Sequence, residues 1–130
     1  MQLTITTIIF GLPTGQRTVQ THLTLPVPTL TVHELIAHKV RQEVAECAAH
    51  QRPGLSGEFL SPETLIRAVR PAALMPGAVE AEVARAQCAF AARDFMIVID
   101  NRRVFAPNTV VTLHPETRVE FIKILPLVGG

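Results

Sequence analysis

The residues of this chain with the clearest potential for chemistry stand at its end, where the sequence reads LPLVGG and stops on Gly129 and Gly130. Glycine loses more conformational freedom on ordering than any other residue, so two glycines add nothing to the end of a buried strand. Chain ends also commonly fray. Two interpretations remain: the ending is a frayed terminus without a role, or the terminal carboxylate of Gly130 is itself the reacting group.

Other combinations of reactive residues are weaker. His33 and His38 in HELIAH are five residues apart, about 140° around a helix, so they cannot chelate one zinc ion together. GLPTG lacks the Lys-Ser/Thr of a phosphate-binding loop. No Ser/His/Asp or Cys/His arrangement stands out, and Cys47 and Cys88 are interpreted as buried free thiols. We therefore expect no catalytic residue, no metal and no cofactor: the chain is a substrate of enzymes and not itself an enzyme.

The totals fit one globular domain of 130 residues, with 48% hydrophobic and 18% charged residues. A net charge of +1 argues against a dedicated nucleic-acid surface. The apolar runs, such as MIVI, are too short to cross a membrane. The opening MQLTITTIIF has no basic lead and alternates like a strand, so it does not resemble a signal peptide. We expect a cytoplasmic protein.

The elements that must position the tail begin with a hairpin. Period-two alternation from Leu3 predicts a strand that runs to about Phe10. Turn residues occupy 11–16. A second alternating run covers 17–25, so the two runs form an N-terminal hairpin.

A helix is predicted from Thr31 to about His50. Thr31 and Glu34 stand at the spacing of a capping box, in which each side chain satisfies a backbone N–H of the other residue. Apolar residues then recur at helical spacing along one stripe that faces a core. Four intervening polar residues are expected to face water: Lys39, Arg41, Gln42 and Glu46.

The segment from about Arg52 to Arg93 differs in character. Ser61 and Pro62 form a helix start signal, and the Ala- and Glu-rich text that follows is spaced for another helix. Neither run extends a sheet, so 52–93 is interpreted as a helical insertion. Its removal is expected to leave a folded core, because surface insertions cost little loop-closure entropy.

Strand signals resume after this segment. DFMIVID predicts a buried strand, NRR a tight turn, VFAP an edge piece, TVVTLHPET a short strand and RVEFIKIL a last, central strand. In the last strand Val119 and Phe121 are expected to face the helix, which leaves Ile122 and Ile124 on the opposite face. Two possibilities stay open for that face: a docking patch beside the tail, or a surface covered by the inserted helices.

In this order of elements the chain resembles the ubiquitin-like β-grasp family, over Met1 to about His50 and Phe95 to Gly130. TVHELI, VIDNRRV and LPLVGG are similar to the helix start, the strand–turn–strand and the Gly-Gly tail of the bacterial sulfur-carrier proteins of thiamine and molybdopterin synthesis. The resemblance implies an α+β fold: a single domain over 1–130, in which a mixed sheet packs on one long helix, plus the insertion 52–93.

The resemblance also implies a chemistry for the tail. Family members are adenylated at the C-terminal carboxylate by a ubiquitin-activating-type enzyme at the expense of ATP. Bare Gly129 and Gly130 would pass through the narrow channel that leads to the nucleotide, because glycine has no Cβ. The residues expected to bind the activating enzyme are Ile122, Ile124, Pro126, Leu127 and Val128.

Two functions share this activation step. A protein modifier of the bacterial ubiquitin-like type would pass the Gly130 acyl group through a thioester to an amine of a target protein, with a conjugating enzyme and a deconjugating peptidase as further partners. A sulfur carrier would convert the adenylate into a thiocarboxylate for cofactor biosynthesis. The modifier is favoured, because the segment 52–93 would crowd a synthase built for a minimal carrier. A third alternative is a non-covalent interaction module whose Gly-Gly end is incidental.

Lysine occurs only at Lys39 and Lys123, although arginine is plentiful. Isopeptide formation requires an amine that can lose its proton, and the guanidinium group of arginine cannot. A modifier of this composition is therefore expected to form few polymeric chains, linked through Lys39 or the amino group of Met1.

Overall fold

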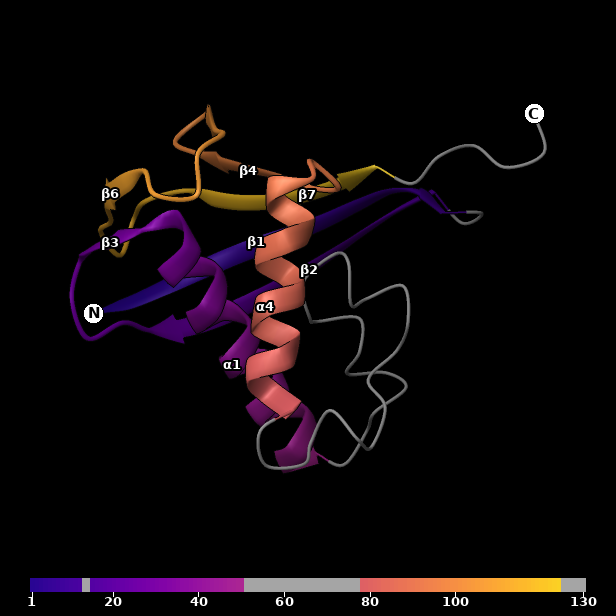
Figure 1. Ribbon diagram of the computed structural model, residues 1–130, viewed down its shortest axis with the longest axis horizontal. Helices are drawn as coiled ribbons and strands as arrows, with labels where there is room; N and C mark the ends of the chain where they lie inside the picture. Colours follow the sequence, from indigo (N-terminus) through magenta and orange to yellow (C-terminus); the bar gives the residue numbers. More distant parts are fainter. Residues whose placement is uncertain (13–14, 51–77, 125–130) are drawn as a thin grey trace.

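The computed structural model describes residues 1–12, 15–50 and 78–124 and shows an α+β fold (Figure 1). Its elements are, in chain order, β1 (Gln2–Leu12), β2 (Gly15–Thr24), β3 (Thr29–Thr31), α1 (Val32–His50), α4 (Ala78–Ala91), β4 (Met96–Ile99), β5 (Arg102–Val104), β6 (Val110–Thr112) and β7 (Val119–Ile124).

A mixed sheet with the strand order β2-β1-β7-β4-β5 forms one layer. β7 pairs with β1 in parallel, and the other neighbouring strands are antiparallel. The last strand is therefore central, as the sequence predicts. Helix α1 packs on one face of the sheet, which gives the β-grasp arrangement (Figure 1). β3 and β6 pair separately as a two-stranded sheet.

The turn between β4 and β5 lies one residue earlier than the sequence suggested. Asp100 and Asn101 have φ values of 48° and 66°, and Ile99 pairs with Arg102 across them. Positive φ at both central residues is the requirement of a type I′ hairpin turn, and Asp and Asn tolerate it. NRR is thus not a turn as a unit, because its two arginines begin β5.

Helix α1 starts at the predicted capping box. The Thr31 backbone N–H donates to Glu34 Oε1 over 3.0 Å, and the Glu34 N–H donates to Thr31 Oγ1 over 3.2 Å. These two bonds satisfy backbone donors that a helix start otherwise leaves unpaired. The start of α1 is thereby fixed relative to β3, of which Thr31 is the last residue.

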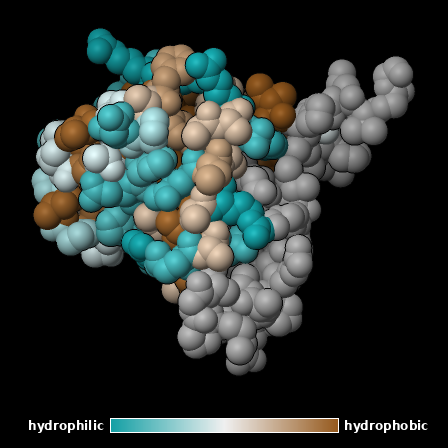
Figure 2. Space-filling model, viewed as in Figure 1, coloured by the Kyte–Doolittle hydropathy of each residue, from teal (hydrophilic) through white to brown (hydrophobic). Residues whose placement is uncertain are grey.

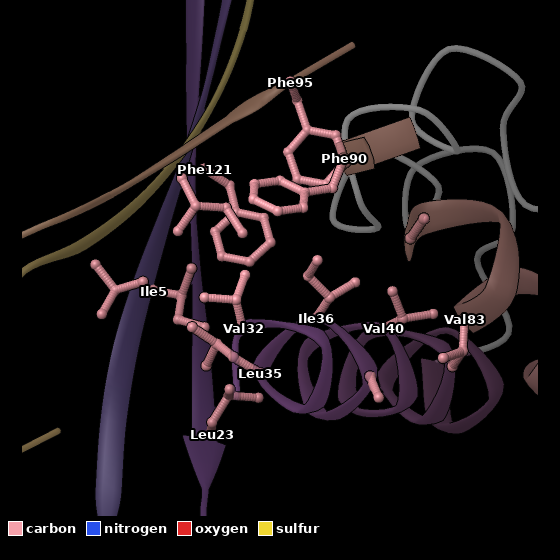
Figure 3. Packing of buried hydrophobic residues seen from close by; sticks show 14 of the residues in the cluster. Ile5, Leu23, Val32, Leu35, Ile36, Val40, Val83, Phe90, Phe95 and Phe121 are labelled. Carbon is pink, nitrogen blue, oxygen red and sulfur yellow. The ribbon is translucent and has the colours of Figure 1, made fainter. Parts of the chain in front are cut away.

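The core lies between the sheet and the helices. Over residues 3–9 of β1 and 19–23 of β2 every second residue is buried, including Leu3, Ile5 and Leu23, which matches the predicted hairpin alternation. Val119 and Phe121 of β7 are also buried, so the predicted inward face of the last strand is confirmed. Figure 3 shows the side chains of Ile5, Leu23 and Phe121 beside the apolar side chains of α1.

Helix α4 belongs to this core, which corrects one expectation about the segment 52–93. Four of its residues are buried in the same cluster as the inner face of the sheet: Val83, Ala86, Ala89 and Phe90. The rings of Phe90 and Phe95 are 5.8 Å apart, and those of Phe95 and Phe121 are 5.6 Å apart (Figure 3). The last part of the predicted insertion is thus a structural layer on α1 and not an appendage. The rest of the predicted insertion, residues 52–77, lies outside the described residues.

Lys39 does not face water, so that expectation was wrong. Its side chain and that of Glu43 are both 0% exposed, and the two form an ion pair one helical turn apart. Thr21 Oγ1 of β2 also donates to Glu43 Oε1 over 3.3 Å. The pair occupies the centre of the stripe that packs on the sheet. Of the other residues expected to face water, Arg41 is exposed, whereas Gln42 and Glu46 are half-buried.

Candidate functional site

Of the predicted site residues, the structure describes Ile122 and Ile124. Gly129 and Gly130, together with Pro126, Leu127 and Val128, lie outside the described residues. The structure does describe the strand from which they follow. β7 is hydrogen-bonded to β1 on one side and to β4 on the other, so the attachment point of the tail is fixed in the middle of the sheet.

The outer face of the sheet carries an apolar cluster at the end of β7. Phe10 pairs with Ile124, and Ile122 lies between Ile8 of β1 and Met96 of β4. Because side chains alternate along a strand, register partners share a face. Residues 119 and 121 point inward, so these five side chains point outward. We call them the tail-root patch: Ile8, Phe10, Met96, Ile122 and Ile124.

The tail-root patch is accessible to different degrees across its width. Ile124 is 60% exposed and Phe10 is 36% exposed, whereas Ile8, Met96 and Ile122 are half-buried. The most accessible pair thus lies at the end of β7. Helix α4, the described part of the predicted insertion, packs on the opposite face together with α1. It therefore does not cover the patch.

The outer face becomes polar farther from the tail. Val98 pairs with Glu120 and with Arg103, and Glu120 forms an ion pair with Arg118 at 3.5 Å. At the β2 edge, Thr4 Oγ1 lies 3.1 Å from His22 Nδ1. One face of the sheet is therefore divided into an apolar end beside the tail and a charged end away from it.

Other exposed hydrophobic residues lie elsewhere in the chain. Val27, Phe105 and Val110 are exposed around the small β3–β6 sheet and after β5, and the Arg103 guanidinium lies 4.5 Å from the centre of the Phe105 ring. On the molecular face seen in Figure 2, hydrophilic residues predominate and strongly hydrophobic residues are scattered. Single exposed apolar residues are usual on protein surfaces. The tail-root patch differs because its members are register neighbours on three adjacent strands.

The buried pair beneath the opposite face has a distinct electrostatic environment. Loss of hydration lowers the pKa of Lys39 and raises the pKa of Glu43, while their mutual attraction opposes both shifts. Among the described residues, Glu43 Oε2 has no hydrogen-bond partner. The Lys39 ammonium group also lies over the ring of Phe121, so the pair connects α1 with β2 and β7. The charge of Lys39 suggested an exposed side chain, although helical geometry places both residues in the apolar stripe.

Residues considered for other chemistry take structural or surface positions. The backbone of His33 donates to Pro107 O and accepts from Gln87 Nε2, so it joins the start of α1 to α4. Cys88 is exposed, which contradicts the expectation of a buried thiol; nothing is described of the Cys47 side chain. Within the described ranges no group of three His, Cys, Asp or Glu residues could hold a metal ion. No described helix is long and apolar enough to cross a membrane.

Comparison with known proteins adds no relative: no family model, curated protein or solved structure is significantly similar to the chain. The fold and the tail-root patch therefore stand on the structure, and any function assigned to them is a proposal.

Proposed function

We propose that this chain is a ubiquitin-like protein modifier. A ubiquitin-activating-type enzyme adenylates the carboxylate of Gly130, and the acyl group passes through an enzyme thioester to an amine of a target protein. The reaction requires a free carboxylate on Gly130, either as the end of the chain or after cleavage behind it. Because it consumes ATP, it belongs in the cytoplasm.

The observation that carries the proposal is the position of the tail-root patch. The most exposed hydrophobic residues of the outer sheet face, Phe10 and Ile124, are paired at the end of the central strand, which the LPLVGG segment follows in the sequence. An enzyme that draws the tail into its nucleotide site must hold the body of the protein beside that point. An apolar surface there provides the contact, since burial of apolar area contributes about 25 cal/mol per Å².

The central position of β7 supports the same proposal mechanically. The tail follows β7 in the sequence, and β7 pairs with β4 as far as Ile122 and with β1 as far as Ile124, so the residue before the tail keeps one position relative to the patch. Fixing the root reduces the freedom that the tail loses on entering a narrow channel. Pro126 restricts the tail further, because its ring fixes φ.

The chemistry proceeds by acyl transfer at one carbon. A carboxylate oxygen of Gly130 attacks the α-phosphate of ATP, and pyrophosphate leaves. An enzyme thiolate then attacks the acyl carbon, with AMP as the leaving group. Finally a deprotonated target amine displaces the thiolate and forms an amide bond. The partners implied are the activating enzyme, a conjugating enzyme, a deconjugating peptidase and the target protein; no step involves nucleic acid or a membrane.

The proposal is tested by ATP–pyrophosphate exchange with adenylating enzymes encoded beside the gene. The full chain should support exchange, and a variant lacking Gly130 should not, although both unfold at the same temperature. Equal exchange by the two forms would contradict the proposal. A stable thiocarboxylate on Gly130 without any conjugate would instead establish the sulfur-carrier alternative.

A further inference from the structure

The amines of this chain differ sharply in accessibility. The sequence contains two lysine side chains, Lys39 and Lys123. Lys39 is 0% exposed, in contact with Glu43 and above the Phe121 ring. Lys123 is half-buried in β7. The Met1 amino group is part-buried and donates to Leu25 O over 3.1 Å.

The Lys39 side chain has no exposed surface, and residues of α1, β2 and β7 contribute to its surroundings. Glu43 lies beside it on α1, Phe121 of β7 lies beneath it, and Thr21 of β2 holds the carboxylate of Glu43. An acyl donor could reach its Nζ only if α1 moved away from the sheet. That movement would break the core around Leu35 and Ile36, both 0% exposed, so it amounts to global unfolding.

The chemical form of Lys39 adds a second barrier. A nucleophilic amine must be neutral and must have space for a tetrahedral intermediate. Although burial lowers the pKa of Lys39, its nitrogen is in contact with a carboxylate and offers no open approach. The abundant arginines are not alternatives, since a guanidinium group stays protonated.

We infer that Lys39 is closed to acylation in the folded protein and that the acceptors on this chain are confined to Lys123 and the amino group of Met1. The expected acceptors were Lys39 and the amino group of Met1; the burial of Lys39 removes it from that set, and Lys123 takes its place. For the proposed modifier, on which this consequence rests, the Lys123→Arg chain with a blocked amino terminus is attached to its target but cannot be extended.

The first test needs no partner enzyme. The native chain is treated with limiting N-hydroxysuccinimidyl acetate, and the acetylated sites are mapped by peptide mass spectrometry. Lys123 should be labelled at least ~100-fold faster than Lys39, and in denaturant both should react alike. Labelling of Lys39 in the native protein at the rate of Lys123 would overturn the inference.

The second test uses conjugation and separates the accessibility of Lys39 from the modifier function. With the activating and conjugating enzymes, N-terminally acetylated Lys123→Arg protein should modify the target as the parent does, with one copy per acceptor. Gly-Gly remnants on Lys39 would refute the inference while supporting the modifier function. Absence of any conjugate from both forms would refute the function, whereas the acetylation pattern would still decide the accessibility of Lys39.

Discussion

The Lys39 ammonium group lies 4.9 Å from the centre of the Phe121 ring. A charge on helix α1 is thereby held against the strand that leads to the tail. A cation over an aromatic face gains electrostatic energy, more so when both are shielded from water. Glu43 forms an ion pair with the same ammonium group. This buried polar cluster therefore helps to fix the position of α1 on the sheet.

The first prediction concerns this cluster. Glu43→Gln removes the carboxylate and leaves the Lys39 charge in the core without it, so the variant should lose about 3–5 kcal/mol of unfolding free energy. The double variant Lys39→Met, Glu43→Leu removes both charges and should stay within about 1 kcal/mol of the parent. Urea unfolding at neutral pH measures both. A double variant as unstable as Glu43→Gln would show that the pair is itself a net stabilising interaction.

A second prediction concerns pH and the capping box. Hydrogen bonds from Thr31 lower the pKa of Glu34 in the folded state. A depressed carboxyl pKa contributes stability that is complete above the unfolded-state pKa and is lost as the pH falls through the folded-state pKa. Glu34→Gln should therefore flatten the stability profile on the acid side, in thermal melts between neutral pH and about pH 3. A Glu34→Gln profile parallel to that of the parent would contradict this assignment.

Thr31→Ala tests the same box from the other side. Loss of the side-chain acceptor at a helix start should cost about 1 kcal/mol. Thr29→Ala is the matched control, because Thr29 is an exposed residue of the same strand whose hydroxyl forms a hydrogen bond with that of Thr112 and takes no part in the capping box. Equal losses from the two substitutions, measured by urea unfolding, would show that the cap is not what holds the start of α1.

Much of this architecture follows from local sequence signals. Local patterns correctly predicted the capping box, the hairpin alternation and the inward face of β7. The residues in these features have environments that depend mainly on near neighbours in the sequence. The position of Lys39 also follows from geometry: at roughly 100° per residue, Lys39 and Glu43 lie between Leu35 and Ile36 around the helix. Lys39 was nevertheless predicted to face water, because a charged side chain is usually exposed. Only the structure shows that each charge supplies the other's partner.

Tertiary packing explains what local signals could not indicate. α4 is rich in alanine and glutamate, a composition that suits an exposed helix as well as a packed one. Its core residues are Val83, Ala86, Ala89 and Phe90. The small alanine side chains allow α4 to pack closely on α1, and the sequence pattern did not predict this packing. The tail-root patch likewise arises from register, since Phe10 and Ile124 are far apart in sequence and meet only through the parallel β1–β7 pairing.

The third prediction tests whether α4 is part of the core. Phe90→Ala should destabilise the chain by about 3–5 kcal/mol, because Phe90 is buried against Phe95. Cys88→Ala, at an exposed position of the same helix, should change stability by less than about 0.5 kcal/mol. Thermal unfolding compares them, and equal melting temperatures for the two variants would place α4 outside the core.

Excision of 52–93 tests the same helix as a whole. The deletion should abolish cooperative unfolding, because it removes α4 and uncovers the side of α1 on which α4 packs. A cooperatively folded deletion variant would show that α4 is dispensable, as the sequence alone suggested.

The fourth prediction concerns the tail-root patch. Ile124→Ala should raise the KM for the chain in pyrophosphate exchange about fivefold, with kcat unchanged, because it removes about 1 kcal/mol of apolar contact made equally in ground and transition states. Val110→Ala is the matched control, since Val110 is 63% exposed and lies in β6, away from the patch. An equal effect of the two substitutions, or none from Ile124→Ala, would show that the enzyme docks elsewhere.

The Gly130 carboxylate is the proposed reacting group, and intact mass spectrometry tests this central claim most directly. The purified chain is incubated with ATP and the activating enzyme encoded beside its gene. The reaction is quenched in acid, and the intact mass of the chain is measured. We expect a species heavier by one adenylyl group, located on the C-terminal peptide and absent when Gly130 is deleted. An unchanged mass, or an adduct that persists without Gly130, would contradict the claim.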